Sequence, residues 1–208
     1  MIAIVDYGMG NLRSVEKALQ KIGQTASVTA DPAEIGRADR LILPGVGAFG
    51  AAMERLRAPG ASGTSLATAV TDFARSRRPF LGICLGMQLL LTESEELGEH
   101  TGLDLLPGQV VRFDVSEHPD LKVPHMGWNA LQFPRASPLF AGLSEGAQVF
   151  FVHSYHCVPA DASVTTATCD HAGPFAAALQ RGNLYATQFH PEKSGDIGLH
   201  ILSNFVGV

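Results

Sequence analysis

Arg78-Pro-Phe-Leu-Gly-Ile-Cys84-Leu-Gly-Met-Gln88 is the stretch that decides the fold of this chain. Residues 79–83 form an apolar run typical of a strand, and residues 87–91 continue as a helix-like run. Between them, glycines flank Cys84 on both sides, which is the pattern of a nucleophile elbow with cysteine in place of serine. In such an elbow the side chain stands on a sharp strand-to-helix turn, where a Cβ at either glycine would crowd the backbone.

A cysteine in this setting is predicted to be a nucleophile. The helix that follows directs its N-terminus at the sulfur, and this positive end favours the thiolate, which is the reactive form. The alternative is a small, buried hydrophobic side chain, which is what most free cysteines are. The two glycines and the strand–turn–helix context favour the nucleophile.

Strand and helix patterns alternate through the first half of the chain. Strands are expected at residues 2–5, 26–29, 40–44 and 79–83, and helices at 11–22, 48–56 and 66–76. The second half is richer in strands, expected at 110–113, 130–133, 148–152, 163–169, 175–180 and 184–189, before a closing helix at 196–206. Apolar strands joined by helical crossovers indicate a parallel sheet covered on both faces. The predicted fold class is α/β: an open, mostly parallel central sheet flanked by helices, with extra antiparallel strands in the second half.

Composition narrows the class of protein. The length of 208 residues suits one domain, expected over residues 1–208, and the 46% hydrophobic content indicates a globular chain. A net charge of −5 without a basic stripe argues against nucleic-acid binding. No apolar run reaches a membrane-spanning length, and residues 1–6 are predicted to form a first strand, not a signal peptide. Cys84, Cys157 and Cys169 show no close pairing, which indicates a reducing, cytoplasmic setting without structural zinc.

Two further patterns could indicate cofactor or metal sites. Gly8-Met9-Gly10 does not complete a dinucleotide fingerprint, because Arg13 occupies the third glycine position. His153, His156 and Cys157 are close in sequence, but a strand would point the two histidines to opposite faces. The sequence therefore predicts neither a cofactor nor a metal site.

A thiolate nucleophile needs a base, a group that orients the base, and donors for the oxyanion. His190 is the best candidate base because it ends an apolar run, Pro191 fixes the backbone after it, and Glu192 is close enough to accept a hydrogen bond from the imidazole. The alternative for His190 is a surface histidine in a turn. The glycine-rich loop Pro44-Gly-Val-Gly47 follows an expected strand and fits the oxyanion donors, although it is also what an ordinary strand–helix turn looks like.

Three motifs in this order resemble the class I (triad) glutamine amidotransferases over nearly the whole chain: Pro44–Gly47, Gly82–Gln88 and His190–Glu192. Four longer segments narrow the resemblance to the amidotransferase subunits of imidazole glycerol phosphate synthases, which act in histidine biosynthesis. These segments are residues 6–11, 122–129, 151–155 and 190–194, and the run Pro-His-Met-Gly-Trp-Asn within 122–129 is the most family-specific.

The resemblance implies a role for each residue that matches a motif. Cys84 attacks the glutamine amide, His190 transfers the proton from the thiol to ammonia, and Glu192 orients His190. The backbone N–H groups of Val46 and Leu85 form the oxyanion hole. The implied glutamine-binding residues are Gly45, Gln88, Glu96, Ser154 and Tyr155. The spacing supports Gln88 independently, because it lies one helical turn after Cys84.

The resemblance also implies a partner, a (β/α)₈-barrel cyclase that consumes the ammonia in a heterodimer. The turn at Met126 and Trp128, together with Lys193 and the loop ending at Asn11, is expected on the docking side. A tryptophan in a Pro/Gly turn is a plausible interface anchor, and its alternative is a core tryptophan. Phe150 stands where the family often has tyrosine, so any hydrogen bond from that hydroxyl is absent here.

Three other functions remain open on the same scaffold. The chain fits an amidotransferase subunit of another synthase, a thiol hydrolase such as a γ-glutamyl peptidase, or a non-catalytic module. Non-catalytic relatives usually lose the cysteine or the histidine, and both are present here. A hydrolase has no need for the segment around Trp128.

Overall fold

One large mixed sheet dominates the computed structural model, which describes residues 1–60 and 63–208. Within those residues, eleven strands form the sheet in the order β2-β1-β3-β4-β13-β12-β10-β7-β5-β6, with β11 paired to β12, while β8 and β9 form a separate hairpin. The strands are β1 Ile2–Val5, β2 Ala26–Thr29, β3 Arg40–Gly45, β4 Phe80–Cys84, β5 Leu91–Ser94, β6 His100–Thr101, β7 Leu106–Arg112, β8 His125–Ala130, β9 Gln148–His153, β10 Tyr155–Pro159, β11 Thr165–Asp170, β12 Pro174–Arg181 and β13 Leu184–Thr187.

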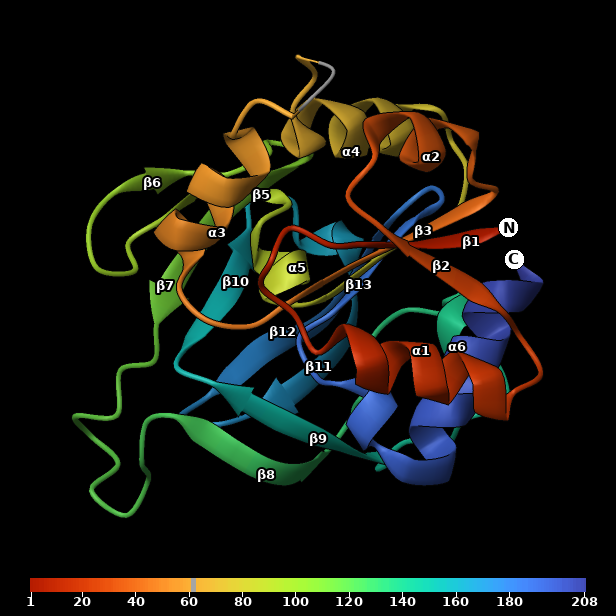
Figure 1. Cartoon of the computed structure of the whole chain (residues 1–208). Coiled ribbons are helices and arrows are strands. Elements are labelled where there is room, and N and C mark those ends of the chain that lie inside the picture. Colours follow the sequence, from red (N-terminus) through yellow and green to blue (C-terminus); the bar gives the residue numbers. More distant parts are fainter. Residues whose placement is uncertain (61–62) are drawn as a thin grey trace.

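Helices cover both faces of this sheet. They are α1 Leu12–Lys21, α2 Pro32–Arg37, α3 Phe49–Arg57, α4 Leu66–Arg75, α5 Leu85–Gln88 and α6 Gly195–Gly207, and short 3₁₀ turns lie at Pro138–Phe140, Ala162–Val164 and Pro191–Lys193. Helices α2, α3 and α4 lie on one side of the sheet and α1 and α6 on the other (Figure 1). Each side has its own apolar core, one around Phe49 and Phe73 and the other around Phe151 and Phe205. No helix in the described ranges is long and apolar enough to cross a membrane.

The central strands confirm the predicted fold class. Strands β2, β1, β3, β4 and β13 run parallel to one another, and every residue of β1, β4 and β13 is buried. Burial on both faces explains why their sequences are continuous apolar runs rather than alternating ones. Beyond β13, strands β12, β10 and β7 pair antiparallel, as the strand-rich second half indicated.

The helix expected at residues 87–91 is wrong in its extent. Helix α5 ends after one turn, and β5 begins at Leu91. The carbonyl of Leu89 accepts the N–H of Leu103, and the carbonyl of Leu90 accepts those of Leu105 and Leu106, so neither is free for a helical bond. One turn aligns only a few peptide dipoles, and the expected electrostatic help from a following helix is correspondingly small.

Other elements also differ from the expectation: β5, β6 and β10 were not predicted, and β7 begins earlier than the strand expected at residues 110–113. The strand expected at residues 130–133 lies earlier, as β8, and this strand includes the segment expected to be a turn. Gly127 tolerates a φ of +135° and lets the strand continue through it, so its turn-like composition was misleading. Helix α2 was not predicted, although Asp31 accepts a hydrogen bond from the N–H of Ala33 and Pro32 occupies the first turn, both typical of a helix start.

Candidate active site

The carboxyl ends of three neighbouring parallel strands meet at one edge of the sheet. Gly45 at the end of β3 is paired with Cys84 at the end of β4, and Thr187 at the end of β13 is paired with Ile83. The chain beyond β13 leads to His190. In open α/β sheets this edge is where ligands bind, so the topology brings the predicted nucleophile, base and glycine-rich loop to one place.

The backbone at Cys84 is strained. Its φ of +55° and ψ of −111° lie outside the regions that a side chain normally allows. The flanking glycines are sterically required: a Cβ on Gly82 would lie 2.8 Å from the carbonyl oxygen of Gly86, and one on Gly86 would overlap the carbonyl oxygen of Leu43. Cys84 as a residue is only 7% exposed, and this turn holds its sulfur at the edge of the sheet.

A buried amide contacts the sulfur. Gln188, which has no exposed surface, donates from Nε2 to Cys84 Sγ over 3.7 Å, and Sγ lies 4.0 Å from the carbonyl oxygen of Val152. Gln188 was not among the residues that the motifs predicted for the site. The available signal was its position two residues before His190, since alternate residues of an extended segment point the same way.

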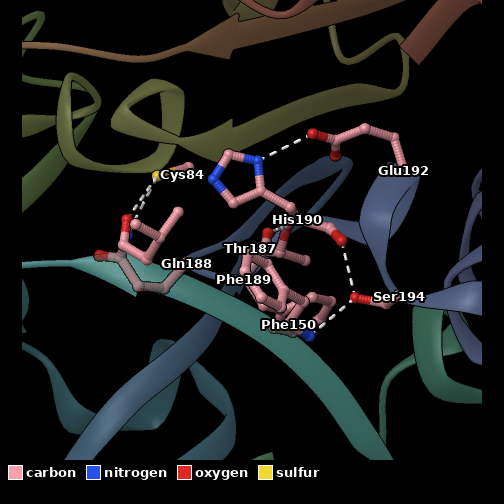
Figure 2. Close-up of polar contacts among 9 residues, drawn as sticks. Cys84, Phe150, Thr187, Gln188, Phe189, His190, Glu192 and Ser194 are labelled. Carbon is pink, nitrogen blue, oxygen red and sulfur yellow. Dashed lines mark hydrogen bonds and ion pairs between the residues drawn. The ribbon is translucent and has the colours of Figure 1, made fainter. Parts of the chain in front are cut away.

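His190 lies between the sulfur and a carboxylate (Figure 2). Its Nδ1 is 2.8 Å from Glu192 Oε1, and the Glu192 side chain is only 1% exposed. Because a carboxylate accepts, Nδ1 carries the proton, and Nε2, which has no hydrogen-bond partner, points toward Cys84. Burial alone lowers the pKa of His190, but its interactions with the neighbouring Cys84 and Glu192 outweigh burial and raise that pKa to about 9.

A serine fixes the turn that carries these groups. Ser194 Oγ donates to the carbonyl oxygen of His190 over 2.6 Å and accepts the N–H of Phe150 over 3.0 Å. The N–H of His190 in turn donates to the carbonyl oxygen of Phe150 over 3.0 Å. The turn after β13 is therefore attached to β9 through the Ser194 hydroxyl and the backbone of Phe150, without the Phe150 side chain. Ser194 was not predicted as a site residue.

A cavity of about 330 Å³ opens beside the sulfur. It is lined by Val46, Gly47, Cys84, Leu85, Gln88, Glu96, Pro124, Val152, His153, Ser154, Tyr155 and His190. Four of the five residues expected to bind substrate are among them. Gly45, the fifth, lies behind the wall, where a Cβ would overlap the Tyr7 hydroxyl and approach Leu85 Cβ to 2.9 Å.

Polar groups of the cavity are held by the fold. Glu96 Oε2 accepts the N–H of Phe49 over 2.6 Å at the start of α3, so this carboxylate is anchored and is not simply one of a solvated acidic run. Gln88 Nε2 donates both to the carbonyl oxygen of Tyr155 and to Oε1 of Gln188, each over 3.0 Å. Across the cavity, Val46 is 40% exposed at the tip of the glycine-rich loop.

Comparison with known proteins decides the family. The model of the class-I glutamine amidotransferases matches residues 3–207. The chain belongs to this family. Imidazole glycerol phosphate synthase subunit HisH of Syntrophotalea carbinolica is 56% identical over 208 residues, covering 99% of this chain and 98% of the relative. The same subunit of Geobacter sulfurreducens is 51% identical over 207 residues, covering 98% and 97%.

Solved structures show the same fold at low sequence identity. The crystal structure of a glutamine amidotransferase matches with a TM-score of 0.71 and 20% identity, covering 100% of this chain and 100% of that one. PurLQS from Thermotoga maritima matches with a TM-score of 0.72 and 18% identity, covering 99% and 97%. The arrangement of sheet and helices is therefore shared with proteins of distant sequence.

The residues expected on the docking side of this amidotransferase have different surroundings. Met126 and Trp128 are 68% and 56% exposed on the outer face of β8, so the core alternative for Trp128 is wrong. Lys193 is exposed at the end of the 3₁₀ turn that follows His190. Asn11 is half-buried at the start of α1, and its side chain does not cap that helix.

The histidines at 153 and 156 do not lie on one strand, contrary to the expectation. Ser154 separates β9 from β10, and both imidazoles pack against Phe113, with ring centres 5.1 and 4.6 Å away. His153 uses one nitrogen toward Tyr155 and the other toward His125, so it has no free nitrogen to serve as an alternative base in this amidotransferase. In the described part of the chain, no group of three or more His, Cys, Asp or Glu residues is arranged to hold a metal ion.

Proposed function

We propose that this chain is the glutaminase subunit of an imidazole glycerol phosphate synthase and that residues 1–208 act as one amidotransferase domain. It hydrolyses L-glutamine to glutamate and ammonia and delivers the ammonia to a cyclase subunit. The observation that carries the proposal is the free Nε2 of His190 facing the strained Cys84, with Glu192 on the opposite nitrogen. Relatives named as HisH, at 49–56% identity over nearly the whole chain, support the choice of synthase.

The chemistry follows from that geometry. The thiol proton passes to His190 Nε2, a transfer that the raised pKa of this imidazole favours, and the resulting thiolate of Cys84 bonds to the side-chain amide carbon of glutamine. The tetrahedral oxyanion is stabilised by the N–H groups of Val46 and Leu85, both on the cavity wall. When the C–N bond breaks, His190 returns the proton to the departing nitrogen. Ammonia is released, and the acyl group remains on Cys84 as a thioester. A water activated by His190 then hydrolyses the thioester to glutamate and regenerates Cys84.

The cavity supplies contacts for the rest of the substrate. The second oxygen of the anchored Glu96 carboxylate accepts from the α-ammonium of glutamine. Gln88, Ser154 and Tyr155 surround the opposite side. Gly45 contributes indirectly, since the absence of a Cβ lets the loop carrying Val46 sit close to Leu85.

A (β/α)₈-barrel cyclase is the proposed partner in a cytoplasmic heterodimer. It uses the ammonia to form imidazole glycerol phosphate and AICAR. The exposed side chains of Met126 and Trp128 present a large apolar surface on β8, and Lys193 and Asn11 are the further contacts proposed for this partner. Exposed apolar side chains of this size are typical of interaction sites.

Glutamate release and covalent labelling test the proposal together. The complex carrying Cys84→Ala should release no glutamate above background, while Cys157→Ala should retain activity because that buried thiol on β10 does not line the cavity. A diazo-ketone analogue of glutamine should label Cys84 and leave Cys157 and Cys169 unmodified in the peptide mass spectrum. Normal glutamate release by Cys84→Ala would refute the proposed nucleophile.

A further inference from the structure

Four histidines surround Phe113 between the β8–β9 hairpin and the large sheet, and two of them belong to one hydrogen-bonded chain. His125 Nδ1 lies 3.0 Å from His153 Nε2, and His153 Nδ1 lies 2.8 Å from the carbonyl oxygen of Tyr155. At the other end, Asn129 Nδ2 lies 3.1 Å from His125 Nε2. These contacts join the hairpin to the segment that lines the cavity.

The direction of every bond in this chain is fixed by its last member. The Tyr155 carbonyl can only accept, so His153 carries its proton on Nδ1 and accepts on Nε2. His125 must then donate from Nδ1 and accept on Nε2, which is where the Asn129 amide donates. Only the neutral imidazoles, each with its proton on Nδ1, satisfy all three contacts.

A second arm reaches the same carbonyl from the nucleophile. Gln88 Nε2 donates to the Tyr155 oxygen over 3.0 Å and to Gln188 Oε1, and Gln188 Nε2 donates to Cys84 Sγ. Both lone pairs of the Tyr155 oxygen are therefore used, one by His153 and one by Gln88. This carbonyl positions a wall of the cavity and an amide beside the reacting sulfur.

The environment of the two histidines keeps them neutral. Burial, and then the charge of His171, lower the pKa of His125 to about 4. Burial is also the largest cause that lowers the pKa of His153, to about 3. Protonation of either ring would place two N–H groups against each other within the chain, so the neutral state and the hydrogen-bond pattern require one another.

We infer that His125 and His153 are positioning residues that hold the Tyr155 carbonyl and Gln88 in place for glutamine binding. The inference rests on the proposed glutaminase function and extends it to residues that do not touch the reacting atoms. His125 is buried while its neighbours Met126 and Trp128 on β8 face outward, so the same strand carries the proposed docking residues and the inner support of the substrate cavity. Loss of the support should weaken glutamine binding more than it slows the chemical step.

Two amide substitutions at one position separate the links of the chain. His125→Asn places an amide where Nδ1 was and keeps a donor to His153. His125→Gln places its amide where Nε2 was and keeps the contact with Asn129 only. His156→Gln is the matched control, because this ring stacks on the same Phe113, its Nδ1 has no partner, and it belongs to no link of the chain.

The measurement is the rate at which the diazo-ketone analogue of glutamine labels Cys84 in the full chain. Its dependence on analogue concentration gives a dissociation constant and a maximal rate of labelling. His125→Gln should raise the dissociation constant of the analogue about tenfold, which corresponds to ~1.4 kcal/mol, with the maximal rate within about threefold of wild type. His125→Asn and His156→Gln should each stay within about threefold in both constants. Equal dissociation constants for His125→Asn and His125→Gln, or a tenfold rise of that constant in His156→Gln, would overturn the inference.

Nitrogen NMR of the unmodified chain at pH 7 gives an outcome independent of labelling. The shifts should show His125 and His153 neutral and protonated on Nδ1, and a proton on Nε2 of either ring would overturn the inference even where a variant does not fold. Wild-type protein that the analogue fails to label at Cys84 contradicts the proposed glutaminase instead, and the NMR result then decides the hydrogen-bond chain by itself.

Discussion

Gly45→Ala should reduce both stability and turnover, because the end of β3 has no room for a methyl group. A Cβ there would overlap the Tyr7 hydroxyl, lie 2.9 Å from Leu85 Cβ and lie 3.1 Å from the backbone nitrogen of Gly86. Overpacking of a buried site costs about 1–3 kcal/mol. For a chain of this size that cost lowers the melting temperature by roughly 2–12 °C.

Tyr7 determines how much of this cost is steric. Its hydroxyl is buried and has no hydrogen-bond partner, and burial, followed by the charge of Cys84, raises the pKa of Tyr7 so that it stays protonated. Tyr7→Phe removes an unsatisfied buried group and should be neutral or stabilising by up to about 1 kcal/mol. In the double variant with Gly45→Ala, the contact with the hydroxyl is gone, so more than half of the lost stability should return.

Urea unfolding of the four proteins gives the double-mutant cycle, and glutamate release gives the functional readout. Turnover of Gly45→Ala should fall by as much as ~10²–10³-fold if the displaced loop withdraws the Val46 donor from the oxyanion. Gly36→Ala is the control, since Gly36 lies in α2 with open space around it and should be neutral or slightly stabilising. Wild-type stability in Gly45→Ala, or no recovery in the double variant, would refute the steric argument.

Four further outcomes are expected. His190→Ala should lower kcat by about 10²–10⁴-fold and Glu192→Gln by less, because the base carries the proton and its partner only orients it; a parental rate in His190→Ala would show that another group is the base. The raised pKa of His190 means that its protonated form, paired with Cys84 and Glu192, stabilises the folded protein. This stability is complete below about pH 6.5 and is lost as pH rises through about 9. The free energy of unfolding in urea should therefore decline across this window, and Glu192→Gln should reduce the decline. Trp128→Ala should weaken binding to the cyclase more than tenfold in a titration, and unchanged affinity would assign the side chain to a passive surface. Glutamate production should rise from the free glutaminase to the complex and again when the cyclase binds its nucleotide substrate, because partner contacts can favour the loop state in which the Val46 N–H faces the oxyanion; equal kcat in all three states would contradict this gating.

The sequence predicted the parallel half of the sheet well because local and global preferences agree there. The strands Ile2–Val5 and Ala26–Thr29 were predicted to the residue, and β3 and β4 to within one residue at each end. Each run is continuously apolar or is bounded by turn residues, so its period and length leave little choice. The spacing of Gly82 and Gly86 around Cys84 likewise predicted the strained turn from the sequence alone.

Tertiary contacts decided the elements that the sequence could not give. Helix α5 is short because the segment from Leu103 to Leu106 takes the carbonyls of Leu89 and Leu90, and these groups are separated by more than ten residues. The hydrogen bond between His125 and His153 joins β8 to β9, two strands whose pairing has no local sequence signature. Gln188 was within reach of a simple argument from alternation, whereas the anchoring of Glu96 by the start of α3 depended on how distant loops pack.

The position of β13 in the sheet has a consequence for how the protein is made. This strand lies between β4 and β12, yet it is translated roughly 100 residues after Cys84, which takes about 5–20 s at ribosomal rates of 5–20 residues per second. Until β13 leaves the ribosome, the nascent sheet lacks a central member and the cysteine has no histidine beside it. Folding and enzymatic competence therefore arrive in a single late step, and a ribosome that stalls before this strand releases a chain that can neither close its core nor consume glutamine.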